Sequence, residues 1–86
     1  MERGAPILDV RTPGEFAGGH VRGAMNIPVE QLAKRLTEVP EGPVVVYCRS
    51  GMRSRRARAM LEGAGHEVLD MGRLTAFPPD LLGEVG

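Results

Sequence analysis

The sequence predicts an α/β fold with a small open parallel sheet of about four strands. Short apolar runs alternate along the chain with segments of helical period. The run "VVVY", which ends at Tyr47, has no polar alternation, as is typical of a strand covered on both faces of a parallel sheet. We expect the 86 residues to form one domain, because a chain of this length supports a single modest core.

The first elements are a strand and a capped helix. The segment "PILDV" predicts a strand that ends near Asp9. In "TPGEF", Thr12 is expected to cap a helix, with Pro13 at its first position and Glu15 three residues after the cap, the pattern of a capping box. Two glycines follow and are expected to end this helix within about one turn.

The middle of the chain predicts a short strand and a longer helix. "AMNIP" indicates a brief extended segment, and "VEQLAKRLTEV" is expected to form one helix over residues 29–39. Its apolar positions recur on one helical face: Val29, Leu32, Ala33, Leu36 and Val39. The prolines and glycine of "PEGP" then end it.

The last elements are a buried strand, a helix and a further strand. "VVVY" precedes a helical pattern in which Ala57, Met60, Leu61 and Ala64 recur on one face, and two glycines close it. "HEVLDM" predicts the final strand. The alternation of strand and helix is typical of a parallel sheet with crossover helices.

Cys48, the only cysteine, lies between the buried strand and the loop "RSGMRS". Ligands of parallel sheets bind beyond the carboxyl ends of strands, where successive loop amides and a helix dipole form an anion cradle and lower a thiol's pKa. Gly51 can take a backbone angle that other residues avoid, and Ser54 could cap the next helix. Arg49 and Arg53 add positive charge. These features favour a reactive thiolate over a buried inert cysteine.

Composition excludes several classes of function. Eleven basic residues balance eleven acidic ones, so bulk charge favours neither nucleic acid nor a membrane surface as a partner. Arg55, Arg56 and Arg58 are expected on an exposed helix face, without the aromatic residues of a nucleic-acid platform. No leader or membrane span is recognisable, and one cysteine forms no internal disulfide, so we expect a cytoplasmic protein.

Neither a metal nor a cofactor is expected. His20 has no second histidine or carboxylate at ligand spacing and is interpreted as structural, whereas His66 is interpreted as a surface residue that enters the last strand. The methionines are interpreted as core residues rather than as a site for a soft metal.

The chain resembles the rhodanese-like sulfurtransferase domain from Ile7 to about Phe77. "LDVRTPGEFAGGHVRGAMNIP" is similar to the family's first signature, and "VVVYCRSGMRSRRARAMLEGAG" to its active-site strand, loop and helix. The resemblance implies a parallel sheet with helices on both faces. It also implies ping-pong sulfur transfer, in which the Cys48 thiolate takes the outer sulfur of thiosulfate or another sulfane donor and carries it as a persulfide. The sulfur would then pass to a thiol, to cyanide or to a protein of a sulfur relay.

The resemblance and the local sequence also suggest a role for each site residue. Cys48 is expected to be the nucleophile, and Asp9 and Arg11 resemble the family's strand-end pair that braces the active loop. Guanidinium groups offer paired donors to the oxyanion of thiosulfate, although each arginine could instead be solvated or tied to a carboxylate. Backbone amides that hold the donor are expected from Arg49, Ser50, Gly51, Met52 and Arg53.

The chain departs from the family pattern in two places. It begins almost on "PILDV", without the family's usual earlier strand and helix, and it has Gly72, Arg73 and Phe77 where Gly-Gly and tryptophan are common. If the earlier strand normally pairs with "HEVLDM", that strand is an exposed edge here, and exposed edges invite pairing with another chain. A homodimer or partner contact through this strand is therefore expected.

Two other functions compete with sulfur transfer. A phosphatase or arsenate reductase would resemble Cys-x5-Arg, whereas this chain has Cys-x4-Arg from Cys48 to Arg53, with Ser54 where the arginine would fall. The amides of the shorter loop form a tighter ring, which fits one sulfur atom better than a whole phosphate group. The non-enzyme alternative is a persulfide carrier or docking module with little turnover of its own, which would accept sulfur from a protein donor.

Overall fold

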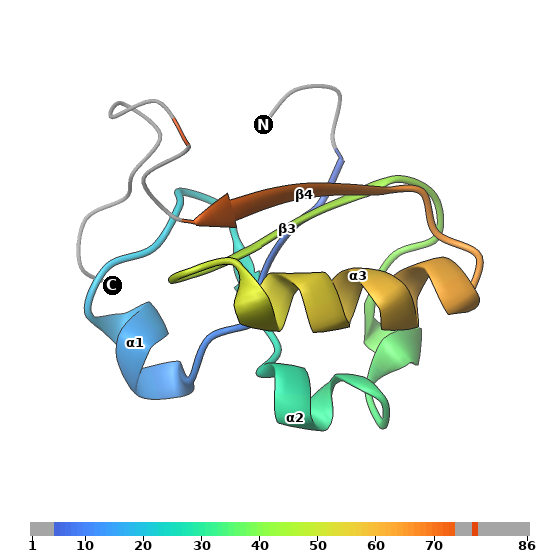
Figure 1. Cartoon of the computed structure of the whole chain (residues 1–86). Helices are drawn as coiled ribbons and strands as arrows, with labels where there is room; N and C mark the ends of the chain where they lie inside the picture. The colour runs from blue at the N-terminus through green and yellow to red at the C-terminus, as the bar shows by residue number, and fades with distance from the viewer. Residues whose placement is uncertain (1–4, 74–76, 78–86) are drawn as a thin grey trace.

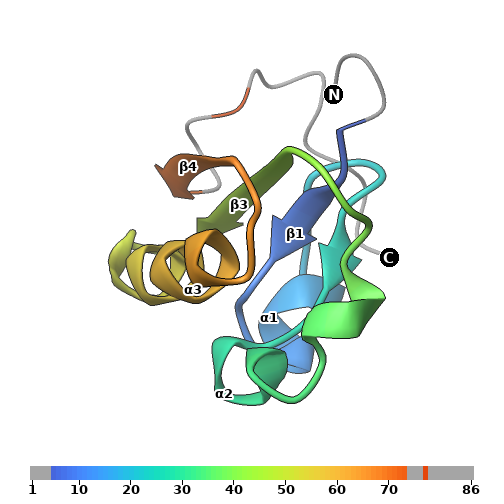
Figure 2. The ribbon, with the colours of Figure 1, turned by 90° about the vertical axis from the view of Figure 1, so that its right-hand side faces the viewer.

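The computed structural model describes residues 5–73 and residue 77, and it places four parallel strands in the sheet order β2-β1-β3-β4 (Figures 1 and 2). The strands are β1 (Ile7–Asp9), β2 (Met25–Asn26), β3 (Val44–Cys48) and β4 (Val68–Arg73). The helices are α1 (Pro13–Ala17), α2 (Val29–Leu32) and α3 (Met52–Gly63), with the 3-10 helix η2 at Leu36–Glu38. The predicted open parallel sheet with helices is confirmed.

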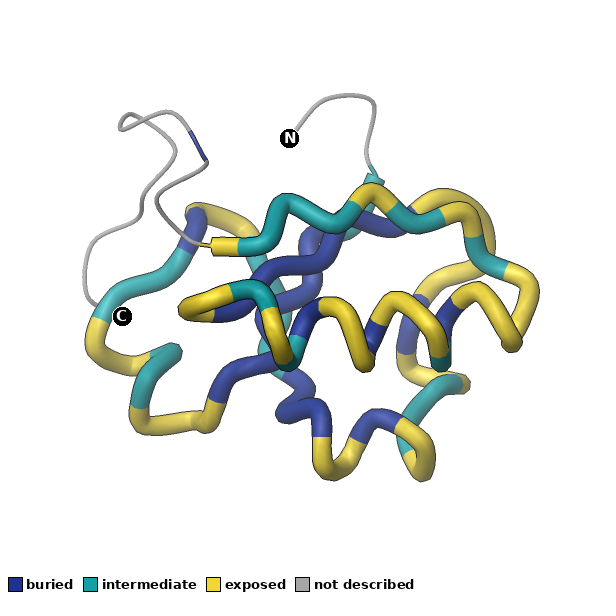
Figure 3. The backbone as a smooth tube through the Cα atoms, viewed as in Figure 1, coloured by how far each residue is buried: buried dark blue, intermediate teal, exposed yellow. Residues whose placement is uncertain are grey.

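Strand β3 lies at the centre of the sheet, between β1 and β4. All five of its residues are buried, which explains why its sequence lacks polar alternation (Figure 3). Tyr47 pairs with Asp9 on one side and with Gly72 on the other. The pairing with β4 shifts register between Val46 and Tyr47, so β4 bulges beside the end of β3. The bulge places a β4 carbonyl next to Cys48.

The two faces of the sheet pack differently. Helices α2 and α3 lie on the same face (Figure 2), where Leu32 and Leu61 join the larger buried cluster with Val46. The opposite face holds a smaller cluster, in which Tyr47 packs against the loop residue Val21 and an edge of the Phe77 ring. In the described part of the chain, a loop and Phe77, rather than a helix, cover this second face.

The start of α1 confirms the predicted capping box. The Thr12 hydroxyl accepts a hydrogen bond from the Glu15 amide at 3.2 Å, and the Glu15 carboxylate accepts one from the Thr12 amide at 2.9 Å. Pro13 occupies the first turn, where its missing N–H costs nothing, and Gly18 is the C-cap. The cap fixes the position of Glu15, whose carboxylate also binds Arg53 in the first turn of α3.

The prediction of a single helix over residues 29–39 is wrong. The chain forms α2, a turn, and then η2. Leu36 and Val39 still pack against the same cluster as Leu32, because the turn and η2 carry them back to that face. A 3-10 segment repeats every three residues, so apolar spacing alone does not separate it from a continuous helix. The Arg35 guanidinium bonds the Gln31 and Glu38 side chains and holds this turn.

Strand β4 is an edge of the sheet among the described residues, as expected for "HEVLDM". Its Leu69 side chain is 54% exposed. Pairing of this edge with a second chain stays a prediction. The tail "PPDLLGEVG" lies outside the described residues. No helix in the described ranges is long and apolar enough to cross a membrane.

Candidate active site

The Cys48 sulfur lies at the carboxyl end of β3, between the active loop and the β4 bulge. We call residues 49–53, which comprise the loop after β3 and the first two residues of α3, the active loop. The Gly51 amide donates to Sγ at 2.9 Å, and Sγ lies 3.4 Å from the carbonyl oxygen of Gly72. Cys48 is fully buried as a residue. The sulfur therefore contacts a donor on the loop side and an acceptor on the sheet side.

Gly51 makes the turn from the loop into α3. Its φ is 101°, in the left-handed region that glycine reaches without strain, and it is the N-cap of the helix. The expectation that Ser54 caps α3 is therefore wrong, because the helix already begins at Met52. Ser54 lies buried in the first turn instead, where its hydroxyl donates to the Gly51 carbonyl at 3.1 Å.

The pKa of Cys48 lies below its ordinary value of 9.0. Burial raises this pKa, but hydrogen bonds from the amide and hydroxyl of Ser54 and from the amides of Gly51 and Ser50 outweigh burial. The Ser54 hydroxyl has one hydrogen, so it donates either to the Gly51 carbonyl or, after rotation, to the thiolate. Hydrogen bonds from backbone amides and one hydroxyl thus make the main contribution to stabilising the thiolate, and the charge of Arg53 also interacts with it.

The lowered pKa predicts how the alkylation rate of Cys48 changes with pH. Because only the thiolate reacts, the rate should rise with pH to a plateau, with a midpoint below that of an unperturbed thiol. Ser54→Ala removes a hydroxyl donor and should move the midpoint upward. Iodoacetamide kinetics followed by mass spectrometry measure both, with Thr37→Ala, an exposed hydroxyl in η2, as the control. An unshifted wild-type midpoint would contradict the amide cradle.

The two arginines of the active loop have different surroundings. The Arg53 guanidinium forms two hydrogen bonds with the Glu15 carboxylate, at 2.7 and 3.0 Å. This contact with Arg53 lowers the pKa of Glu15 to about 2, although partial burial opposes the shift. Arg49 is exposed and takes part in none of the ion pairs between described residues. Arg53 thus joins α3 to α1, whereas the Arg49 guanidinium is available to a ligand.

Asp9 and Arg11 form a buried ion pair under the site. The Arg11 guanidinium bonds both Asp9 carboxylate oxygens, the shortest contact being 2.6 Å, and also donates to the Gly19 carbonyl at 2.7 Å. The Tyr47 hydroxyl donates to Asp9 at 2.7 Å and accepts from the Val21 amide at 3.0 Å. Burial, with the Asp9 contact, raises the pKa of Tyr47. No hydrogen bond in the described structure joins this pair to the active loop.

Among the described residues, the pair therefore contacts the strand of the site through Tyr47, the residue before Cys48 in β3, rather than through a hydrogen bond to the active loop. Tyr47 and Glu15 are the two supporting residues that the sequence analysis did not assign to the site. Tyr47 ends an apolar run, and its partner Asp9 lies 38 residues away in the chain. Glu15 was recognised only as a capping residue, although the same carboxylate also binds Arg53.

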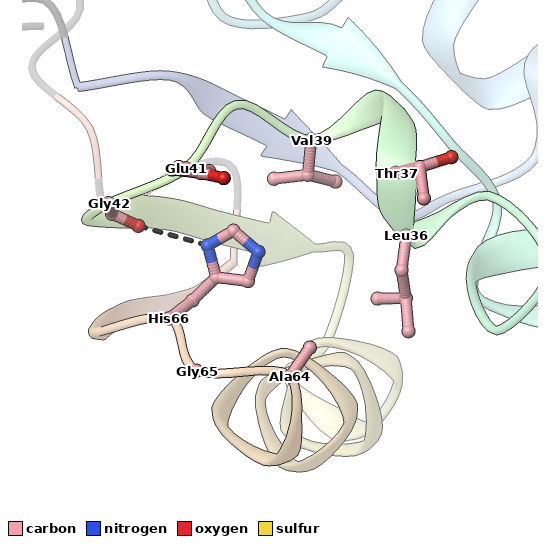
Figure 4. A pocket seen from close by; sticks show the side chains of 8 residues that line it. All are labelled: Leu36, Thr37, Val39, Glu41, Gly42, Ala64, Gly65 and His66. Atoms are coloured by element: carbon pink, nitrogen blue, oxygen red, sulfur yellow. Dashed lines mark hydrogen bonds between the residues drawn. The ribbon is translucent and has the colours of Figure 1, made fainter.

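A hollow lies at the end of β3 opposite to Cys48, near the junction of α3 and β4 (Figure 4). Its volume is about 540 Å³. The His66 ring lines it and lies 2.9 Å from the Gly42 carbonyl through Nδ1, which agrees with a surface residue that leads into β4. His20 stacks on Phe16 with 3.7 Å between ring centroids, in keeping with a structural role. The hollow is separate from the Cys48 site.

A family model for the rhodanese-like domain matches residues 1–72, and the chain belongs to that family. Among curated relatives, an uncharacterized Bacillus subtilis protein, YqhL, is 47% identical over 73% of this chain and 51% of its own length. The Escherichia coli thiosulfate sulfurtransferase PspE is 39% identical over 69% of this chain and 60% of its own length. The chain therefore spans between half and three fifths of these two relatives.

Solved structures agree with the family assignment. A rhodanese from E. coli, solved with anions, superposes with a TM-score of 0.77 at 35% identity and covers 85% of this chain and 91% of its own. A rhodanese-like domain protein from Staphylococcus aureus has a TM-score of 0.81 at 26% identity, over 95% of this chain and 82% of its own. Relatives named thiosulfate sulfurtransferase thus place the chain in a sulfurtransferase family.

Proposed function

We propose that the protein is a sulfurtransferase that moves a sulfane sulfur from thiosulfate, or a related donor, to a nucleophilic acceptor through a persulfide on Cys48. The observation that carries this proposal is the Cys48 sulfur, which receives the Gly51 amide at 2.9 Å and has a lowered pKa. A thiolate in a ring of amide donors can attack a sulfur atom and then hold the negative charge of the persulfide.

The proposed cycle has two steps. The Cys48 thiolate attacks the outer sulfur of thiosulfate, the sulfur–sulfur bond of the donor breaks, and its electron pair leaves with sulfite. A cyanide ion or a thiolate then attacks the outer sulfur of the persulfide, and the Cys48 thiolate leaves. No oxidant is consumed in either step. The amides of Gly51 and Ser50 and the Ser54 donors would stabilise Cys48 each time it is anionic.

Site geometry favours sulfur transfer over phosphatase or arsenate reductase chemistry. A tetrahedral oxyanion needs a wide ring of donors and an arginine that contacts it. Here the Arg53 guanidinium is bound to Glu15, and the turn at Gly51 brings its amide to within 2.9 Å of the sulfur. The name of the E. coli relative, thiosulfate sulfurtransferase, supports the same choice.

The persulfide carrier remains the second candidate. A Bacillus anthracis structure described as CoADR-RHD superposes with a TM-score of 0.75, yet the match covers only 13% of that chain. A similar fold is therefore also found as a small part of a larger protein, so a domain of this kind can work as one module among others. A carrier would form the persulfide but turn over thiosulfate slowly.

Intact mass spectrometry tests the proposed function. After incubation with thiosulfate, the protein should gain about 32 Da for one sulfur atom and lose it on addition of cyanide. A parallel sample with para-nitrophenyl phosphate should show no hydrolysis. Persulfide formation from a protein persulfide donor, with slow turnover of thiosulfate, would identify the carrier. Phosphoester hydrolysis without a mass gain from either donor would refute the proposal.

The surroundings of the two loop arginines predict unequal effects on thiosulfate. Arg49→Ala removes the exposed guanidinium of the residue that follows Cys48 and should lower kcat/KM for this dianion roughly tenfold, mainly through KM. Arg49→Lys should recover part of the loss, because lysine restores the charge but not the planar fork. Arg53→Ala should change KM less, since Arg53 is bound to Glu15. Steady-state kinetics at several salt concentrations measure this. Wild-type values of kcat/KM and KM for Arg49→Ala would contradict a role for Arg49 and would mean that the backbone amides alone bind the donor.

A further inference from the structure

The solvent-facing side of α3 carries positive charge that begins next to the sulfur. Residues 49–61 include five arginines and no acidic residue. Glu15 binds Arg53, and Glu62 binds Arg58. No ion pair between described residues involves Arg49, Arg55 or Arg56, and all three are exposed. A chain of zero net charge thus concentrates uncompensated positive charge beside its reactive thiol.

Arg53, Arg55 and Arg56 border a hollow on the surface of α3. Its volume is about 670 Å³, and its lining residues are Ser50, Met52, Arg53, Arg55, Arg56 and Ala59. Four of them follow the spacing i, i+3, i+4 and i+7 and lie on one helical face: Met52, Arg55, Arg56 and Ala59. We call these four residues the α3 stripe. All four are exposed, so the stripe faces solvent.

The stripe combines an apolar anchor with paired charges. Met52 is 72% exposed and is one of only two large hydrophobic side chains with high exposure among the described residues. It follows Gly51 directly, the residue whose amide contacts the sulfur. Ala59 is small and leaves space between the arginine side chains, whose methylene groups can line a hollow. The stripe extends roughly 10 Å along the helix at 1.5 Å per residue.

From these features we infer that the α3 stripe docks an acidic peptide segment of the protein that exchanges sulfur with Cys48. A surface of this length fits a short chain segment, whereas thiosulfate is small enough to be bound by Arg49 and the amides at the sulfur, outside the α3 stripe. Two unpaired guanidiniums complement carboxylates, and exposed Met52 offers an apolar contact at the end nearest Cys48. The inference rests on the proposed function, because it names the partner of that sulfur transfer.

The exchange step requires no further reagent. A cysteine thiolate in the docked segment attacks the outer sulfur of the Cys48 persulfide, the bond from that sulfur to Sγ breaks, and Cys48 leaves as the thiolate. Docking raises the local concentration of the attacking thiolate and leaves the chemistry at Sγ unchanged. The stripe should therefore affect transfer to acidic thiols and not transfer to cyanide.

A single-turnover assay with matched peptides tests this. Persulfide-loaded protein is mixed with a cysteine pentapeptide flanked by glutamates, or with its glutamine or lysine counterpart, and loss of about 32 Da is followed by mass spectrometry. Rates are divided by the thiolate concentration of each peptide. At low salt the glutamate peptide should react about fivefold faster than the glutamine peptide, and this preference should disappear near 1 M salt, where screening is strong.

Two variants that change the net charge by the same amount separate an effect of the α3 stripe from an effect of the protein's overall charge. The double variant Arg55→Gln/Arg56→Gln and the control Lys34→Glu each lower the net charge by two, and Lys34 lies in the turn after α2. The double variant should lose the preference for the glutamate peptide and keep its rate with cyanide, whereas Lys34→Glu should keep both. Equal rates for the three peptides in the wild-type protein, or an equal loss in Lys34→Glu, would overturn the inference.

A binding experiment that involves no sulfur transfer tests the docking surface separately from the proposed sulfurtransferase function. The glutamate peptide with serine in place of cysteine should perturb the amide resonances of the α3 stripe in the unloaded protein, and Arg55→Gln/Arg56→Gln should abolish the perturbation. Binding without persulfide formation would support the docking surface and refute the sulfurtransferase. Persulfide formation without peptide binding would support the sulfurtransferase and refute the docking surface. Binding of a single-stranded oligonucleotide to the stripe, without peptide binding, would also overturn the inference.

Discussion

Cys48→Ser should abolish persulfide formation and reduce sulfur transfer from thiosulfate to cyanide to the uncatalysed rate. Cys48 is the only cysteine in the chain, and its sulfur is the atom that the Gly51 amide contacts. A serine hydroxyl is smaller than a thiol and accepts the same hydrogen bond, so the β3–loop–α3 junction should keep its shape. Intact mass after thiosulfate, together with thiocyanate production, measures the loss.

Two controls make this result specific. The wild-type protein alkylated at Cys48 should lose the same activity, because the sulfur is blocked while every other residue is kept. The denaturation midpoint of Cys48→Ser should stay close to that of the wild-type protein, which shows that the variant is folded. Retained transfer to cyanide in the folded variant would rule out a persulfide on Cys48 as the intermediate.

Asp9→Ala should have the largest effect on stability. Asp9 is fully buried and binds the Arg11 guanidinium and the Tyr47 hydroxyl. Its removal leaves a buried positive charge and a hydroxyl without their acceptor, which typically costs about 3–5 kcal/mol. That cost is a large part of the total stability of an ordinary domain, about 5–15 kcal/mol. Urea denaturation followed by circular dichroism measures the change.

Glu38→Ala is the matched control for Asp9→Ala. It also removes a carboxylate from an ion pair with an arginine, Arg35, but that pair is exposed on the surface. The urea midpoint of Glu38→Ala should stay near the wild-type value. Asp9→Asn keeps one acceptor oxygen and the side-chain shape, so it should fall between the two. A midpoint for Asp9→Ala equal to that of Glu38→Ala would show that the buried pair adds little stability.

Local sequence patterns predicted the elements whose causes are themselves local. The capping box needs only Thr12 and Glu15, three residues apart, and β3 needs only a run of apolar residues. The position of Cys48 at the end of that strand followed directly. In contrast, the break after α2 was missed, because a turn followed by a 3-10 segment can keep the same apolar residues facing the core.

The contacts within the site could not be read from the sequence. Ser54 was expected to cap α3, but Gly51 adopts a left-handed conformation and starts the helix three residues earlier, a choice that depends on the whole loop. Arg53 was a candidate for donor binding, and sequence alone could not show that it lies against Glu15, 38 residues away. Side-chain pairing across such separations depends on the completed fold.

The parallel sheet also has a consequence for folding kinetics. Ile7 of β1 pairs with Val45 of β3, and the difference between 45 and 7 is 38 positions. Parallel neighbours cannot be joined by a tight hairpin, so each pairing requires closure of a long loop before its contacts form. Domains dominated by such contacts fold more slowly than helical bundles of similar length. Because β3 pairs on both sides, Cys48 gains its complete surroundings only when β1 and β4 have both joined it, and the thiol is open to oxidation until then.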